Sequence, residues 1–91
     1  MESNWKPLSD GWTAKDLVDT ADTIRKELTK PDATIQQVAE DYGLDPVDVL
    51  VVFGVHLEEG PPNVVAGKYG VSIKDITAAR KHGEGAPKEF A

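Results

Sequence analysis

The sequence contains no cysteine, and this absence excludes two kinds of small protein. Without thiols the chain can form neither a disulfide framework nor a thiolate metal site. A chain of 91 residues must then be held together by its hydrophobic core, which is modest at this size. A domain without disulfides suits a reducing compartment, so we expect a cytoplasmic protein.

Long apolar runs are also missing. The longest covers residues 49–55, well short of the roughly 18–20 residues that span a bilayer. The first residues, Met1 to Asn4, have neither the basic nor the apolar region of a signal peptide. We therefore expect no membrane association, in agreement with a cytoplasmic location.

Basic residues are scarce, with 10 Lys and Arg against 16 Asp and Glu and a net charge of −6. This balance disfavours nonspecific attraction to nucleic acid or to acidic lipid. The charge is unevenly spread, because residues 1–60 carry 5 basic and 13 acidic residues, whereas residues 61–91 carry 5 and 3. An acidic body with a mildly basic C-terminal third indicates that the two parts do different jobs.

The residue groups that support catalysis or metal binding are lacking too. His56 and Glu59 could share a helix face, but metal sites usually need three or four ligands. We find no Ser–His–Asp order, nucleophile elbow or phosphate-cradling glycine loop. The sequence therefore predicts no enzyme, no metal, no cofactor and no small-molecule substrate.

What the chain does have is helical periodicity. Residues 13–29 form the clearest predicted helix, with Thr13 and Asp16 spaced as a capping box and with Pro31 ending the helix. Its apolar residues recur on one stripe: Leu17, Ala21, Ile24 and Leu28.

The preceding residues, 1–12, have no helical period and predict an irregular lead. Two tryptophans in it, Trp5 and Trp12, have two interpretations. Either they fold back onto the core, which a small domain needs, or they are exposed aromatic anchors for a partner.

The rest of the chain contains an internal repeat. Residues 38–49 and 65–76 align with a shift of 27 positions, and five of the twelve pairs are identical. Each unit predicts a helix, a turn at glycine and a second helix, over residues 34–59 and 61–82. We thus expect one all-α domain over residues 13–82, a small bundle of about five helices containing two helix-turn-helix-like units. A mobile tail over residues 83–91 should follow.

The second unit, residues 62–81, resembles the helix-turn-helix superfamily of DNA-binding regulators. Ala66 is the small residue where the two helices would cross, and Gly70 makes the turn four residues later. Five apolar positions would face the core: Val65, Tyr69, Val71, Ile76 and Ala79. The resemblance implies a regulator that reads duplex DNA with the helix over residues 72–81. The implied contact residues are Lys68, Ser72, Lys74, Thr77, Ala78, Arg80 and Lys81.

The first unit fits the same pattern as a degenerate copy at residues 35–54. Its second helix, within residues 46–58, is apolar nearly all round, as expected of a helix buried in a core or an interface. This leaves an alternative hypothesis, a non-catalytic protein-interaction or self-association module. Its contact residues would be Leu50, Val51 and Phe53, together with Trp5 or Trp12. A homodimer would also suit paired DNA half-sites.

Overall fold

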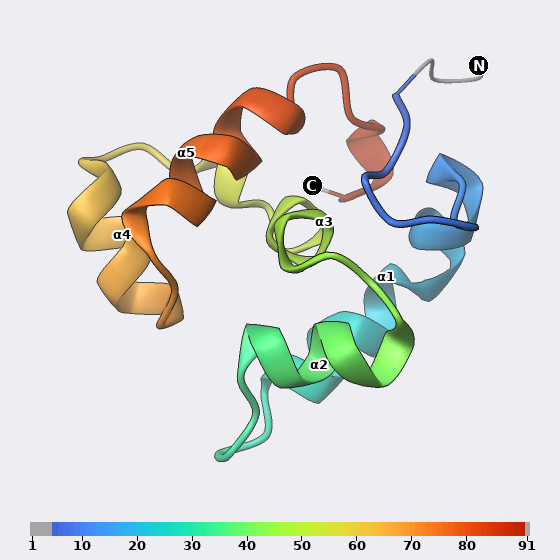
Figure 1. Ribbon diagram of the computed structural model, residues 1–91, viewed down its shortest axis with the longest axis horizontal. Coiled ribbons are helices and arrows are strands. Elements are labelled where there is room, and N and C mark those ends of the chain that lie inside the picture. The colour runs from blue at the N-terminus through green and yellow to red at the C-terminus, as the bar shows by residue number, and fades with distance from the viewer. Residues whose placement is uncertain (1–4, 91) are drawn as a thin grey trace.

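A computed structural model describes residues 5–90, which contain five α-helices and no strand (Figure 1). They are α1 (Ala14–Leu28), α2 (Ile35–Tyr42), α3 (Pro46–Val52), α4 (Pro62–Tyr69) and α5 (Ile73–His82). Two short 3₁₀ helices follow α3 and α5, namely η1 (Val55–Leu57) and η2 (Lys88–Phe90). The predicted all-α bundle is confirmed. Within residues 5–90, no helix is both long and apolar enough to cross a membrane.

Helix α1 begins and packs as its sequence predicts. The hydroxyl of Thr13 accepts a hydrogen bond from the Asp16 amide at 3.1 Å, and the Asp16 carboxylate accepts one from the Thr13 amide at 3.0 Å. This capping box satisfies amides that a helix start leaves unpaired. At the other end of α1, the Arg25 guanidinium donates to the Val52 carbonyl at 3.1 Å, so α1 also caps the end of α3.

The two predicted units share one local backbone geometry. Gly43 ends α2 with φ 69° and ψ 32°, and Gly70 ends α4 with φ 67° and ψ 33°. Only glycine adopts this left-handed conformation without cost. The amide after each glycine donates to the carbonyl of the alanine four residues before that glycine, from Leu44 to Ala39 at 2.8 Å and from Val71 to Ala66 at 3.1 Å.

Helix α3 forms the centre of the molecule. Figure 1 shows it nearly end-on, and it packs against α1, α2, α5 and η1. Every residue from Val47 to Val52 is buried. A helix that is apolar nearly all round is stable only when it is surrounded in this way.

The position of α3 corrects the interaction surface that the alternative hypothesis places on this helix. Leu50 and Val51 have no exposed surface, and Trp5 is only 8% exposed. Phe53 is half-buried and packs edge-on against the ring of Tyr69, with centroids 5.3 Å apart. Leu50, Val51 and Trp5 belong to the core, whereas Phe53 is only partly covered. Phe53 and Trp12, which are both half-buried, keep surface that a partner could reach.

One buried carboxylate connects the N-terminal lead to α3 and α5. Asp48 is fully buried and accepts hydrogen bonds from the amides of Leu8 and Ser9 at 3.0 and 2.8 Å. It also accepts one from the Ser9 hydroxyl at 2.5 Å and lies 2.9 Å from Nε2 of His82. The Ser9 hydroxyl in turn accepts from the Asp45 amide at 2.7 Å. The lead is irregular, as predicted, but these bonds hold it against the core.

The C-terminal segment also differs from its prediction. Phe90 is fully buried and packs edge-on against Trp5, with ring centroids 5.7 Å apart. The Trp5 indole N–H donates to the His82 carbonyl at 2.6 Å. Residues 83–90 therefore return to the core instead of forming a mobile tail, because burying a phenylalanine contributes about 1.5–3 kcal/mol. Residues 1–4 and 91 of the predicted lead and tail lie outside the described chain.

Replacing Asp48 tests this connection. We expect Asp48→Ala to lower the free energy of unfolding by about 3 kcal/mol or more, because it leaves several buried donors without an acceptor. Asp48→Asn keeps one acceptor oxygen and should lose less. Asp22→Ala, at an exposed position of α1, should change stability by no more than about 0.5 kcal/mol. Urea unfolding measures all three, and equal losses for Asp48→Ala and Asp22→Ala would contradict the assignment.

Two glycines should respond in opposite ways to alanine. Gly67 lies inside α4 with open space around its Cα, so Gly67→Ala should stabilise the protein by about 0.5–1 kcal/mol. A Cβ on Gly83 would lie 2.5 Å from the side chain of His56 and 2.9 Å from the Ala79 carbonyl. Gly83→Ala should therefore cost about 1–3 kcal/mol. Thermal or urea unfolding decides, and stabilisation by Gly83→Ala would contradict this packing.

Candidate nucleic-acid interface

The unit formed by α4 and α5 divides into a buried and an exposed side. Three of the five predicted inward positions, Val65, Ile76 and Ala79, are 0–3% exposed, and Ala66 at the predicted helix crossing is 4% exposed. Tyr69 and Val71 are half-buried. The exposed residues of the turn and of α5 are Ser72, Ile73, Lys74, Thr77 and Lys81. The inward face of the pattern is therefore observed in the fold.

Three side chains on this exposed side are available to a ligand. Lys74, Thr77 and Lys81 are spaced three and four residues apart, which places them on one face of α5. Within the described chain, no carboxylate forms an ion pair with Lys74 or Lys81. The Thr77 hydroxyl donates to the Ile73 carbonyl at 3.1 Å and keeps its acceptor capacity.

The other predicted contact residues make contacts within the domain. Lys68 forms an ion pair with Glu58, with 2.9 Å between Nζ and Oε1. Arg80 donates to the carbonyls of Glu58 and Gly60 at 3.2 and 2.8 Å, and so holds the link between η1 and α4. The hydroxyl of Ser72 caps α5, and Ala78 is half-buried against the core. Of these residues, Lys68 is the most readily available to a ligand, because it is held only by an ion pair at the surface.

Glu58 organises this link, a role that its sequence position does not predict. Its Oε1 accepts hydrogen bonds from the Tyr69 hydroxyl at 2.6 Å and from Lys68 at 2.9 Å. The Tyr69 bond and then the Lys68 bond hold the pKa of Glu58 below its usual value. Burial, followed by the bond to Glu58, raises the pKa of Tyr69. At neutral pH a carboxylate therefore faces a neutral phenol, and α4 is fixed to the segment before it.

Two histidines lie at the C-terminal end of α5. His82 is half-buried between Asp48 and the Trp5 ring, whose centroid is 4.9 Å from that of His82. His56, on η1, has a buried Nδ1 with no hydrogen-bond partner in the described chain. Burial lowers the pKa of His56, since partial removal from water disfavours the charged form of the ring.

The cluster of Ser9, Asp48 and His82 contains the residue types of a hydrolase but not its geometry. The Ser9 hydroxyl donates to Asp48 and not to His82, so no base is placed to activate it. Asp48 is fully buried and Ser9 is 8% exposed. The cluster therefore holds the fold together. In the part of the chain that the structure describes, no group of three or more His, Asp or Glu residues could hold a metal ion.

The lowered pKa of His56 predicts a pH dependence. The unfolded chain binds a proton near the ordinary histidine pKa of 6.5, and the folded chain binds it only at lower pH. Stability should therefore fall as the pH drops from about 7.5 to about 5.5. His56→Gln removes this titration and should flatten the dependence. Urea unfolding across this range measures it, and identical slopes would contradict the burial of His56.

Comparisons of the chain with protein families, with characterised proteins and with solved structures give no match. The candidate interface therefore rests on the burial, hydrogen bonds and charges of the chain's own residues.

Proposed function

We propose that the α4–α5 unit binds duplex DNA, with the exposed face of α5 in the major groove. The observation that carries the proposal is the face formed by Lys74, Thr77 and Lys81, which is exposed while the opposite side of α5 is buried. A reading helix must be held rigidly by its supporting elements. Helix α5 meets this need because it packs against α3, α4 and η1.

The exposed side chains have suitable chemistry for a DNA groove. The two lysines can pair with phosphates or with the acceptor edge of guanine. Thr77 can bond a phosphate oxygen, and Ile73, which is 52% exposed, can contact a thymine methyl group. The turn between the helices presents backbone near phosphates in such units.

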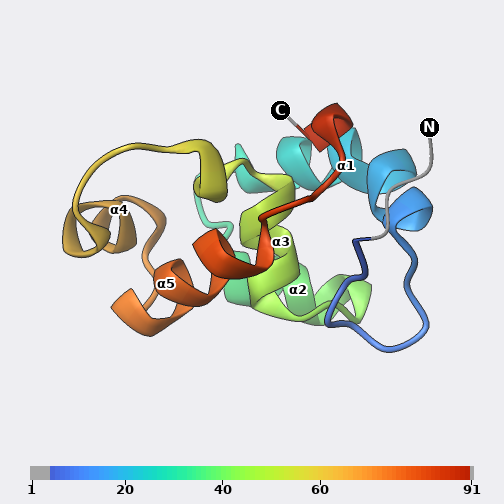
Figure 2. The same cartoon turned by 90° about the horizontal axis from the view of Figure 1, so that it is seen from above.

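The charge distribution would restrict how DNA approaches. In both views α4 lies at the opposite end of the molecule from the start of α1 (Figures 1 and 2). Residues 1–60 carry a net charge of −8, and residues 61–91 carry +2. DNA would be repelled by the acidic body and would meet the protein through the α4–α5 end. With about two or three phosphate contacts, log K should fall with log salt with a slope of only about −2 to −3.

Charge reversal on α5 tests the proposal. We expect Lys74→Glu and Lys81→Glu each to weaken binding to a mixed-sequence duplex about tenfold, because each replaces an attraction to phosphate with a repulsion. Lys26→Glu, at an exposed position of α1, makes the same change in net charge away from the interface. Amide chemical-shift titration at low and then physiological salt gives the affinities and the location of the contact.

The control separates a defined interface from a general charge effect. If Lys26→Glu weakens binding as much as Lys74→Glu does, the contact is not on α5. If the wild-type protein shows no shifts at low salt, the proposed function is wrong and the helix-turn-helix geometry serves packing alone.

A further inference from the structure

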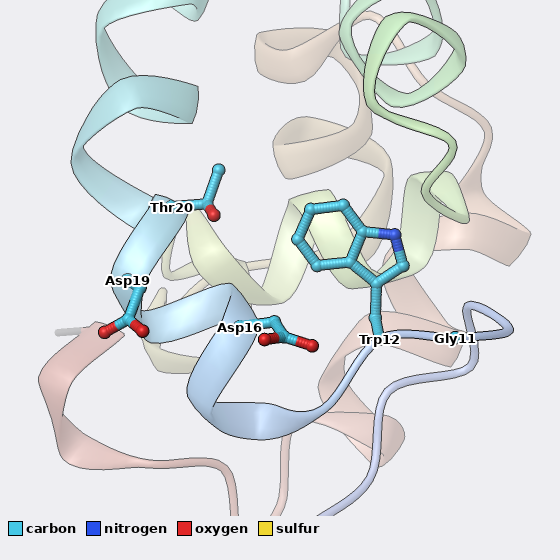
Figure 3. A pocket seen from close by; sticks show the side chains of 5 residues that line it. All are labelled: Gly11, Trp12, Asp16, Asp19 and Thr20. Atoms are coloured by element: carbon cyan, nitrogen blue, oxygen red, sulfur yellow. The ribbon is translucent and has the colours of Figure 1, made fainter.

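A shallow groove lies beside the start of α1, on the acidic part of the chain. It is lined by Gly11, Trp12, Asp16, Asp19 and Thr20 (Figure 3). Gly11 has a φ of 83°, a left-handed conformation that turns the chain just before Trp12. The indole therefore stands beside the first two turns of α1, and its ring forms one wall of the groove.

Trp12 is only partly used by the fold. Its side chain packs against the edge of the core but remains half-buried. No described residue accepts a hydrogen bond from its indole N–H. Indole has the strongest attraction for cations among the aromatic side chains, because its ring face carries negative potential.

The opposite wall supplies two carboxylates that are only partly engaged. Asp16 uses Oδ2 to accept the Thr13 amide, and Asp19 uses Oδ2 to pair with Lys15 at 2.7 Å. Both side chains of the Lys15 pair are exposed, at 82% and 59%, and such pairs exchange readily with solvent. The two carboxylates face one positive charge on Lys15 and a partial charge of about +0.5 at a helix N-terminus, so the groove keeps a small net negative charge.

We propose that this groove binds the guanidinium group of an arginine carried by a basic segment of a partner protein. A planar guanidinium can stack on an indole and donate to a carboxylate at the same time, which the compact ammonium of lysine does less well. The net charge of −8 over residues 1–60 complements a basic segment and accelerates its approach. The groove lies outside the α4–α5 unit, so the inference does not depend on DNA binding.

A peptide titration without DNA tests the proposal. The probe is a five-residue peptide with one central arginine between glycines, compared with the same peptide carrying neutral citrulline. The arginine peptide should shift the Trp12 indole signal and the amides of residues 16–20 in a saturable manner. The citrulline peptide, which has nearly the same shape, should not. The Trp5 indole, which is bonded to His82, serves as an internal reference.

Matched double variants separate a site from a general acidic field. Asp16→Asn with Asp19→Asn removes two charges from the groove while leaving an oxygen to cap α1, and should weaken binding about fivefold or more. Asp22→Asn with Asp32→Asn removes two charges from exposed positions outside it and should leave the affinity nearly unchanged. Equal losses in both variants, equal binding of citrulline, or no saturable shift in the wild-type protein would each overturn the proposal.

Discussion

The fold depends on keeping one carboxylate, that of Asp48, paired in the middle of the protein. An ionised carboxylate without partners would be too costly to bury. Its hydrogen bonds come from the lead through Leu8 and Ser9, and from α5 through His82. The lead, α3 and α5 must therefore adopt their positions together. The same hydrogen bonds fix the orientation of α5 and so of its exposed face.

The two units share one backbone pattern but differ in whether the same face is buried. The residues that correspond to Lys74, Thr77 and Ala78 in the first unit are Val47, Leu50 and Val51, all of which are 0–7% exposed. In the first unit this face is packed within the core. In the second unit Lys74 and Thr77 are exposed and Ala78 is half-buried. The repeat thus places this face in the core in one copy and leaves it largely at the surface in the other.

Local signals in the sequence predicted much of the fold. The capping box of α1, the glycine turns and the inward side of α4 and α5 depend on residues a few positions apart, where periodicity and capping rules apply. The roles of Asp48, Glu58, Arg80 and Phe90 could not be predicted, because their partners are distant in sequence. The same limit applies to the candidate interface, where the sequence predicts Lys74 and Lys81 as contacts but cannot show that Arg80 is held by two carbonyls.

The contacts of Trp5 have a consequence for the order of events during synthesis. Its hydrogen-bond acceptor lies 77 residues later, and the ring that packs edge-on against it belongs to Phe90. A chain emerging from the ribosome can form α1 and the first unit early, because those contacts are local. The indole of Trp5, however, cannot make these two contacts until residue 90 has been made. Final closure of the domain is therefore a late step that follows translation of residue 90.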